Sequence, residues 1–379
     1  MKKIFYFVII SLILVFAGCS KKDNSSKGID AVKIYKNTNP SDKNFKYTTK
    51  ELFSVGEYEE DIADTNVVLN DISMVKTDSK GNLYILDRRK SVVKKFDTKG
   101  EYILSMGKRG NGPGEMVRPS DMVISEDTIY VSDMRARKVL KFDSDGNYIS
   151  DILMPRDTGT PRSFTKFNND KFVGMLSNVS RNSGARVMTI QLSIFDRKFN
   201  VLHSLYSESF DFDWETYNPM DHIIEFTTDN EKVYVVETSN SKYSIKVYDS
   251  DGKHIETIKK NFARIRYSDE EIAYMKEITE RRFRRANIDT DKMTFKNSIK
   301  KLYIDKNGYL LVESARKTEK SDQFQFVVDI FKSGVFLNTV NFNKDNDFYR
   351  AEDEFSKVFV DDKLLIYDDT NMIVKVYSY

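Results

Sequence analysis

Residues 78–104 read DSKGNLYILDRRKSVVKKFDTKGEYIL, and they contain one copy of a unit that recurs along the chain. It begins with a turn at Asp78 and continues as a strand to Asp87, a second strand from Ser91, a tight turn at Gly100 and a third strand to Leu104. The alternation of side chains in Val93–Phe96 and its neighbours is typical of a β-strand, and Asp and Gly residues mark the turns. The stretch therefore predicts three antiparallel strands joined by short connections.

The same unit recurs along the chain. In each copy an aromatic residue precedes the turn after the second of these strands. Successive aromatics are about 46–53 residues apart, except for an interval of 83 residues between Tyr248 and Phe331. A period of about 40–50 residues with several short strands per unit is typical of propeller blades. The recurrences lie at residues 127–146, 171–196, 232–252, 308–331 and 363–377. With residues 78–104 they predict an all-β, six-bladed propeller.

The two ends of the chain predict how the propeller closes. The sixth unit stops at Tyr379, directly after its third strand, so its outer strand is missing from that end. Lys50–Gly56 stands alone before the first unit and resembles Tyr102–Gly107, the fourth strand of unit one. We expect this N-terminal strand to complete the last blade, which leaves no open end blade.

The interval after Tyr248 predicts a helical insertion between blades four and five, at about residues 263–297. Ser268–Glu271 has the pattern of a capping box, and apolar residues follow it at helical spacing. A helix of about twenty residues is expected to pack across one face or edge of the propeller.

The first residues differ in character from the rest. Lys2 and Lys3 precede an apolar run from Ile4 to Ala17, which is short for a bilayer span and typical of a signal peptide. The run ends at Cys19, the only cysteine, and residues 16–19 resemble the lipobox of bacterial lipoproteins, with Phe16 where Leu is usual. This resemblance implies cleavage before Cys19 and acylation of its thiol. The expected domains are a signal peptide at 1–18, a flexible tether at 19–43 and the propeller at 44–379.

Charge and cysteine content exclude several classes of protein. The chain has 60 basic and 58 acidic residues, and residues 1–18 contain two Lys and no acid, so the mature part is neutral. A neutral surface argues against a nucleic-acid partner. The mature part has no cysteine besides Cys19, which excludes disulfides within one chain and cysteine-ligated metals there.

Residues 107–119 (GKRGNGPGEMVRP) resemble the linker between NHL repeats, and Tyr130–Asp133 and Lys138–Asp143 match the strands of such a repeat. The resemblance is specific over residues 71–150 and weaker to residue 379. The whole chain resembles six-bladed β-propeller lipoproteins of the NHL-repeat/TolB-like kind from Gram-negative bacteria. It implies a fold and a cell-envelope location rather than an activity.

An acidic residue ends the second strand in five of the units. Equivalent positions on successive blades form a ring, which suggests either structural caps that accept backbone N–H groups or a cation site near the central channel. Related calcium-dependent lactonase-type propellers have such a site, so calcium is the one cofactor considered. The five acids are Asp87, Asp133, Glu237, Glu313 and Asp368.

Basic residues follow these acids in the first two units, at Arg88, Arg89, Arg135 and Arg137. Because they recur at one repeat position, they predict a ligand- or partner-binding rim, to which Trp214 in the loop between units three and four could add a stacking surface. No motif pairs the three histidines and no catalytic nucleophile motif is present, so no catalytic residue is assigned.

These observations predict a monomeric envelope lipoprotein that is held to a membrane by its lipid anchor. Its propeller is expected to bind a small molecule, a glycan or another envelope protein, without a cofactor. Two alternatives are a metal-dependent lactonase- or lyase-type enzyme and a structural scaffold in an envelope complex. Ser20 after the acylated cysteine, where Asp would favour inner-membrane retention, favours the outer membrane.

Overall fold

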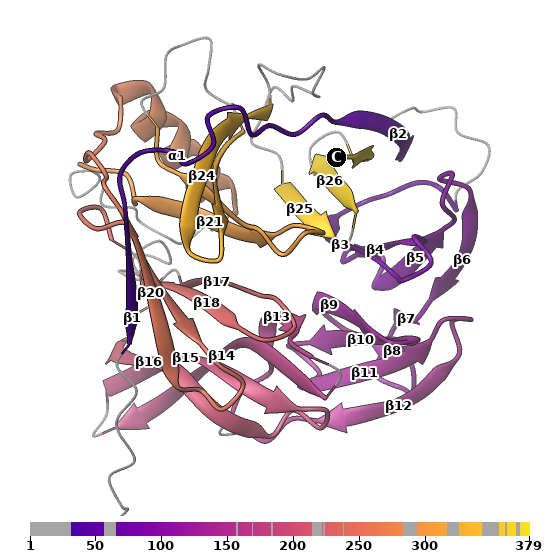
Figure 1. Ribbon diagram of the computed structural model, residues 1–379. Helices are drawn as coiled ribbons and strands as arrows, with labels where there is room; N and C mark the ends of the chain where they lie inside the picture. The colour runs from indigo at the N-terminus through magenta and orange to yellow at the C-terminus, as the bar shows by residue number, and fades with distance from the viewer. Residues whose placement is uncertain are drawn as a thin grey trace, which may run out of the picture. The chain divides into compact units, whose positions relative to one another are not determined.

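The computed structural model describes residues 32–379 except 57–65, 157, 169, 183–184, 214–221, 223, 238, 283–293, 317–325, 343–355, 361 and 369–371. Residues from Val32 onward form one compact unit. Six antiparallel sheets lie around a common centre in this unit (Figure 1). The first strand of each sheet contacts the first strands of the neighbouring sheets, so the ring is closed. The predicted six-bladed propeller is confirmed.

In each blade the strands run from the centre outward in chain order, except that β1 (Lys33–Asn37) and β2 (Lys50–Val55), from the start of the chain, lie outermost in blades four and six. Blade one contains β3 (Ile72–Thr77), β4 (Leu83–Asp87), β5 (Val92–Phe96) and β6 (Tyr102–Met106). Blade two contains β9 (Pro119–Ser125), β10 (Thr128–Asp133), β11 (Lys138–Asp143) and β12 (Tyr148–Leu153). Blade three contains β13 (Arg162–Lys166), β14 (Lys171–Asn182), β15 (Ala185–Asp196) and β16 (Val201–Asp211).

Blade four contains β17 (Ile224–Thr228), β18 (Val233–Glu237), β19 (Ser244–Tyr248) and β20 (His254–Lys260). Blade five contains β21 (Ile299–Ile304), β22 (Leu310–Ser314), β23 (Val327–Lys332) and β24 (Val335–Asn341). Blade six contains β25 (Ser356–Val360), β26 (Lys363–Asp368) and β27 (Ile373–Ser378) from one end of the chain and β2 (Lys50–Val55) from the other. The short strands β7 (Lys108–Arg109) and β8 (Glu115–Met116) pair within the connection between blades one and two.

The aromatic residues that set the repeat period belong to the hydrophobic core. All but one of them are at most 1% exposed, and Tyr248 is half-buried. They lie near the ends of the third strands, where neighbouring blades pack on each other. Burial of a large aromatic side chain contributes several kcal/mol to folding, so the sequence period reflects the spacing of the core. The fully buried members are Phe96, Phe142, Phe195, Phe331 and Tyr377.

The Asp-x-x-Gly sequences form hairpin turns. In the turn after β11, one carboxylate oxygen of Asp143 accepts the backbone N–H groups of Asp145 and Asn147, at 3.0 and 2.8 Å. Gly146 has a φ of 86°, which an L-residue rarely adopts. Asp249 accepts two backbone N–H groups in the same way after β19. These aspartates therefore stabilise turns locally.

The N-terminal strand β2 completes the last blade, as predicted. It pairs antiparallel with β27, the last strand of the chain. The carboxylate of Glu51 on β2 accepts a hydrogen bond from the Tyr377 hydroxyl and forms an ion pair with Lys375, both at 3.1 Å. The two ends of the propeller are thus held in one sheet.

A further strand, β1 (Lys33–Asn37), lies outside β20 and pairs with it in parallel, which gives blade four a fifth strand (Figure 1). These residues fall within the tether expected at residues 19–43, so from Lys33 onward the chain is part of the propeller. Asn37 fixes the end of β1. Its side-chain NH2 group donates to the backbone carbonyls of Lys259 and Gly334, at 3.1 and 3.0 Å. Its side-chain oxygen accepts the backbone N–H of Phe336 at 2.9 Å.

The insertion between blades four and five contains one short helix, α1 (Asp269–Arg282). The capping box is present: Glu271 accepts the N–H of Ser268 at 2.9 Å, and the Ser268 hydroxyl accepts the N–H of Glu271 at 3.2 Å. The expected length of about twenty residues is too long for the described helix, which has 14 residues, and residues 283–293 lie outside the described part. Among described residues, no helix is long and apolar enough to span a membrane.

Substitution of Asn37 tests the contribution of β1. Asn37→Ala removes three hydrogen bonds that join β1 to blades four and five, and we expect a loss of about 2 kcal/mol in unfolding free energy. Chemical denaturation would measure this loss. Lys36→Ala, at an exposed neighbouring position, should change stability by less than about 0.5 kcal/mol. An Asn37→Ala protein as stable as Lys36→Ala would show that the side-chain hydrogen bonds of Asn37 do not stabilise the attachment of β1.

Candidate functional site

A hollow of about 530 Å³ lies on one rim of the propeller, between blades one and two. It is formed by the loops that follow β4 and β10, the start of blade one, and the connection between the two blades. Five of its lining residues are arginines. We call it the arginine hollow, and its lining is Asp71, Arg88, Arg89, Ser91, Arg109, Val117, Arg118 and Arg135.

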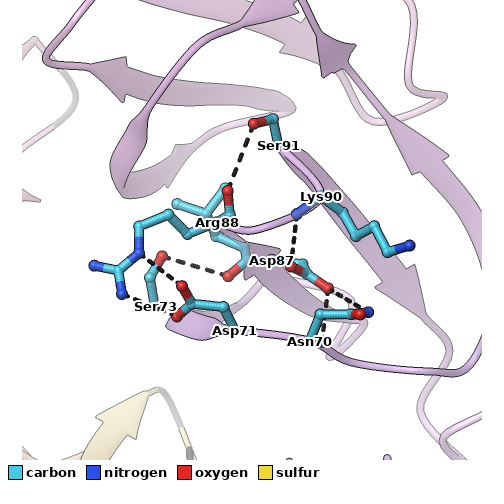
Figure 2. Close-up of polar contacts among 8 residues, drawn as sticks. Asn70, Asp71, Ser73, Asp87, Arg88, Lys90 and Ser91 are labelled. Carbon is cyan, nitrogen blue, oxygen red and sulfur yellow. Dashed lines mark hydrogen bonds and ion pairs between the residues drawn. The ribbon is translucent and has the colours of Figure 1, made fainter.

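Asp87 at the end of β4 shapes the first of these loops. One of its oxygens accepts the N–H of Lys90 at 3.0 Å, and the other accepts the N–H of Asn70 at 2.9 Å (Figure 2). The side chain is fully buried. Ser91 closes the loop with a φ of 58°. Because the buried carboxylate holds the backbone on both sides, Arg88 and Arg89 project from a fixed loop.

Asp133 has the same function at the end of β10. Its carboxylate accepts four backbone N–H groups and is fully buried. Two of these donors, Val117 and Arg118, belong to the connection from blade one, and the other two, Arg135 and Ala136, belong to the next loop. Asp133 therefore positions two arginines of the hollow at once.

The arginine hollow has a large excess of positive charge. Among the described residues, Asp71 is the one carboxylate that lines it, and it forms a two-point ion pair with Arg88, at 2.9 and 3.1 Å (Figure 2). Within the described part of the chain, the guanidinium groups of the other four arginines have no carboxylate within 4.0 Å; these are Arg89, Arg109, Arg118 and Arg135. A guanidinium stays protonated in proteins and presents a planar set of donors that matches carboxylate and phosphate groups. The arrangement favours an anion.

Three of the four predicted rim arginines, Arg88, Arg89 and Arg135, line the hollow. Arg137 does not, because its guanidinium donates to the carbonyl of Met154 at 3.2 Å. Sequence reasoning missed Arg109 and Arg118, which lie in the connection between blades and have no counterpart in the repeat. Trp214 and Cys19 lie outside the described residues.

The four of the five acids whose side chains are described belong to no common cluster of acidic side chains. Asp87 and Asp133 accept backbone N–H groups of nearby loops, as expected if these acids are structural caps and not cation ligands. Glu313 instead accepts hydrogen bonds from Tyr303 and Lys357, at 3.1 and 3.2 Å. Asp368 is buried, and the side chain of Glu237 is not among those described. In the described residues, no group of three or more His, Cys, Asp or Glu side chains could hold a metal ion.

A second cavity, of about 660 Å³, follows the central channel and is lined by the first strands of all six blades. Its charges largely compensate one another: Lys301 lies 3.4 Å from Glu225, and Lys357 lies 3.2 Å from Glu313. Burial raises the pKa of Asp121 to about 6, although Lys76 opposes this shift. The channel therefore has less unbalanced charge than the arginine hollow.

Comparison with known proteins agrees with this architecture. A family model described as 6-bladed beta-propeller, DUF5128, matches residues 37–367, so the chain belongs to that family. No curated protein matches. A presumed exported protein from Bacteroides fragilis shares 13% sequence identity, with a TM-score of 0.53 over 91% of this chain and 99% of its own.

Two further structures have lower TM-scores. Virginiamycin B lyase from Staphylococcus aureus has a TM-score of 0.46 at 10% identity, over 87% of this chain and 99% of its own. A member of the DUF4221 family from Bacteroides vulgatus has a TM-score of 0.47 at 10% identity, over 87% of this chain and 98% of its own.

The raised pKa of Asp121 predicts how stability depends on pH. Between about pH 4 and 6 the folded protein binds a proton that the unfolded chain releases, so stability falls as pH rises through this range. A shift of about two pKa units corresponds to about 3 kcal/mol. Asp121→Asn stays neutral and should lose about 3 kcal/mol less than the wild type between pH 4 and pH 7, measured by denaturation at each pH.

The control is Asp127→Asn, at an exposed position in the turn after β9. It should keep the pH dependence of the wild type. An Asp121→Asn protein with an unchanged pH dependence would contradict the assignment of this titration to Asp121.

Proposed function

We propose that this DUF5128 propeller is a binding module of the cell envelope. Its arginine hollow takes a ligand, or a segment of a partner protein, that carries at least two carboxylate or phosphate groups. The observation that carries this proposal is the presence of five arginines, and a single carboxylate, among the described residues that line one hollow. Only Arg88 is paired with that carboxylate, so four arginines remain available to a ligand that carries two or more anionic groups.

The groups in the hollow suit binding better than acid–base catalysis. A guanidinium does not exchange its proton near neutral pH, so it neutralises and orients an anion. The hydroxyl of Ser91 lies 3.5 Å from the carbonyl of Arg88, within its own loop. No histidine lines the hollow among the described residues. These features support a binding site rather than a hydrolase or lyase centre.

The loops of the hollow are arranged before a ligand binds. Asp87 accepts the N–H of Lys90, the residue after Arg89, and Asp133 accepts the N–H groups of Arg135 and Ala136. Asp71 also fixes the plane of Arg88 through two contacts. A site whose side chains are already fixed loses less entropy on binding.

The proposed location is the outer membrane, through acylated Cys19. It is supported by the signal-peptide pattern of residues 1–18, the lipobox-like residues 16–19 and Ser20. Export also agrees with the presumed exported protein of Bacteroides fragilis that has the same fold. Several acyl chains on one cysteine would give firm membrane attachment.

Substitution of Cys19 tests the anchor. The wild-type precursor should incorporate labelled palmitate and fractionate with membranes, whereas Cys19→Ser should remain unlabelled and leave the membrane fraction. Cys19 is the only cysteine, so no other thiol can carry the label. Ser20→Ala, at the next position, is the matched control and should behave as the wild type. A Cys19→Ser protein that stays in the membranes would contradict the lipid anchor.

Substitutions in the arginine hollow test the proposed binding. Citrate and inorganic pyrophosphate serve as probes because each carries several negative charges. Either probe should raise the melting temperature of the wild type, since a ligand at 100 times its Kd adds about 2.7 kcal/mol of stability. Arg89→Ala with Arg135→Ala should weaken this response at least tenfold in Kd.

The matched control is Arg181→Ala with Arg186→Ala, which removes the same charge from exposed positions on blade three. It should respond as the wild type does. Equal responses from all three proteins would remove the basis for a ligand site in the hollow.

A further inference from the structure

A second basic site lies on the outer part of blade four. It is a groove of about 820 Å³ between the end of β1, the end of β20 and the loop from β18 to β19. Five lysines line it together with three serines and two asparagines, and no Asp or Glu side chain lines it among the described residues. We call it the lysine groove, and its lysines are Lys36, Lys242, Lys246, Lys259 and Lys260.

One of these lysines is structural. The ammonium group of Lys260 lies 2.8 Å from the buried carboxylate of Asp329 and 4.3 Å from the centre of the Phe336 ring. Burial lowers the pKa of Lys260, and Asp329 opposes this shift. Lys260 therefore connects blade four to blade five and is committed to the fold.

Three other lysines have charges left for a ligand. Lys36, Lys242 and Lys259 are exposed, and none has a carboxylate within 4.0 Å among the residues that the structure describes. Lys36 belongs to β1, Lys242 to the loop before β19, and Lys259 to β20, so three separate segments supply them. Because β1 supplies Lys36 and one wall, the groove exists only when β1 is paired with β20.

The strand directions place the lysine groove on the same rim as the arginine hollow. β1 and β20 run in parallel, and both end at the groove. This is the rim where second strands end, as β4 and β10 do at the arginine hollow. β1 begins at the opposite rim, where Lys33 pairs with Glu256 near the start of β20. The first strand of the described chain therefore begins at the rim away from the groove.

We infer that the lysine groove binds an anionic glycan whose successive sugars carry sulfate or carboxylate groups. Lysine ammonium groups act as point charges for such anions, and serine and asparagine side chains can both donate to and accept from sugar hydroxyls. An exported protein meets anionic glycans and anionic lipids. The attachment of the N-terminal segment at the opposite rim favours the glycan. The inference takes its compartment from the proposed function, but its residues form a separate site.

Calorimetric titration of the chain from Ser20 to Tyr379 tests this inference, since the propeller from Val32 is one compact unit. The probes are a heparin hexasaccharide, a galacturonate hexamer and neutral maltohexaose. At least one acidic oligosaccharide should bind, more weakly at higher salt, and maltohexaose should not bind. The triple variant Lys36→Gln, Lys242→Gln, Lys259→Gln should lose at least tenfold in affinity.

The matched control is Lys80→Gln, Lys99→Gln, Lys198→Gln. It removes the same charge from exposed hairpin turns on the opposite rim and should bind as the wild type does. Equal weakening in both triple variants, or no binding of either acidic probe, would overturn the inference. Binding of the protein to vesicles that contain phosphatidylglycerol would also overturn the inference if the groove variant lost this binding and the control variant kept it. The site would then recognise a membrane surface.

The arginine variant separates the two sites. Arg89→Ala with Arg135→Ala should retain the hexasaccharide binding that the groove variant loses. If that variant abolished binding while the groove variant retained it, the lysine groove would be rejected and the arginine hollow supported. Failure of the groove with an intact citrate or pyrophosphate response would reject only the present inference.

Discussion

The antiparallel pairing of β2 with β27 is the constraint on which the rest of the propeller depends. Each blade buries its apolar faces only against its neighbours, so an open ring would expose two blade faces to water. By placing the N-terminal strand in the last blade, the chain closes the ring in a sheet instead of at a loose contact between blades. Glu51 adds a hydrogen bond and an ion pair to that sheet. The positions of all other loops, including those of the basic sites, follow from this closure.

The repeat predicted most of the fold because each blade uses the same local chemistry. Asp and Gly are needed in the hairpin turns, and a large aromatic is needed where third strands pack between blades. What the sequence did not predict has no repeat. β1 has only five residues, lies outside a completed blade and pairs in parallel with a strand more than two hundred residues away. Nothing in Lys33–Asn37 distinguishes it from a polar tether, and the described helix α1 is shorter than its apolar spacing suggested.

The candidate sites show the same division. Arg88, Arg89 and Arg135 could be predicted because they recur directly after the acids that end second strands. Arg109 and Arg118 could not be predicted, because they belong to a connection between blades that does not recur. The lysine groove could not be predicted either, because three segments that are distant in the sequence meet there. The repeated acids were identified correctly as a pattern, but a pattern does not show which atoms a carboxylate contacts. The hydrogen bonds of Asp133 to four backbone N–H groups could be found only from the structure.

These caps fix the loops of one rim through buried carboxylates and not through the arginines that the loops carry. Asp87 and Asp133 satisfy the main-chain groups of their loops from inside the protein, so the outward side chains of those loops do not contribute to holding the backbone. Arginines can therefore lie together there although their like charges repel one another. Among the described residues of the hollow, the carboxylate of Asp71 offsets part of this repulsion through its ion pair with Arg88. β1 has a similar effect at blade four, where it covers the outer edge of β20 and brings Lys36 to the same rim. The fold thus separates the residues that hold its loops from the residues that are available to an anion.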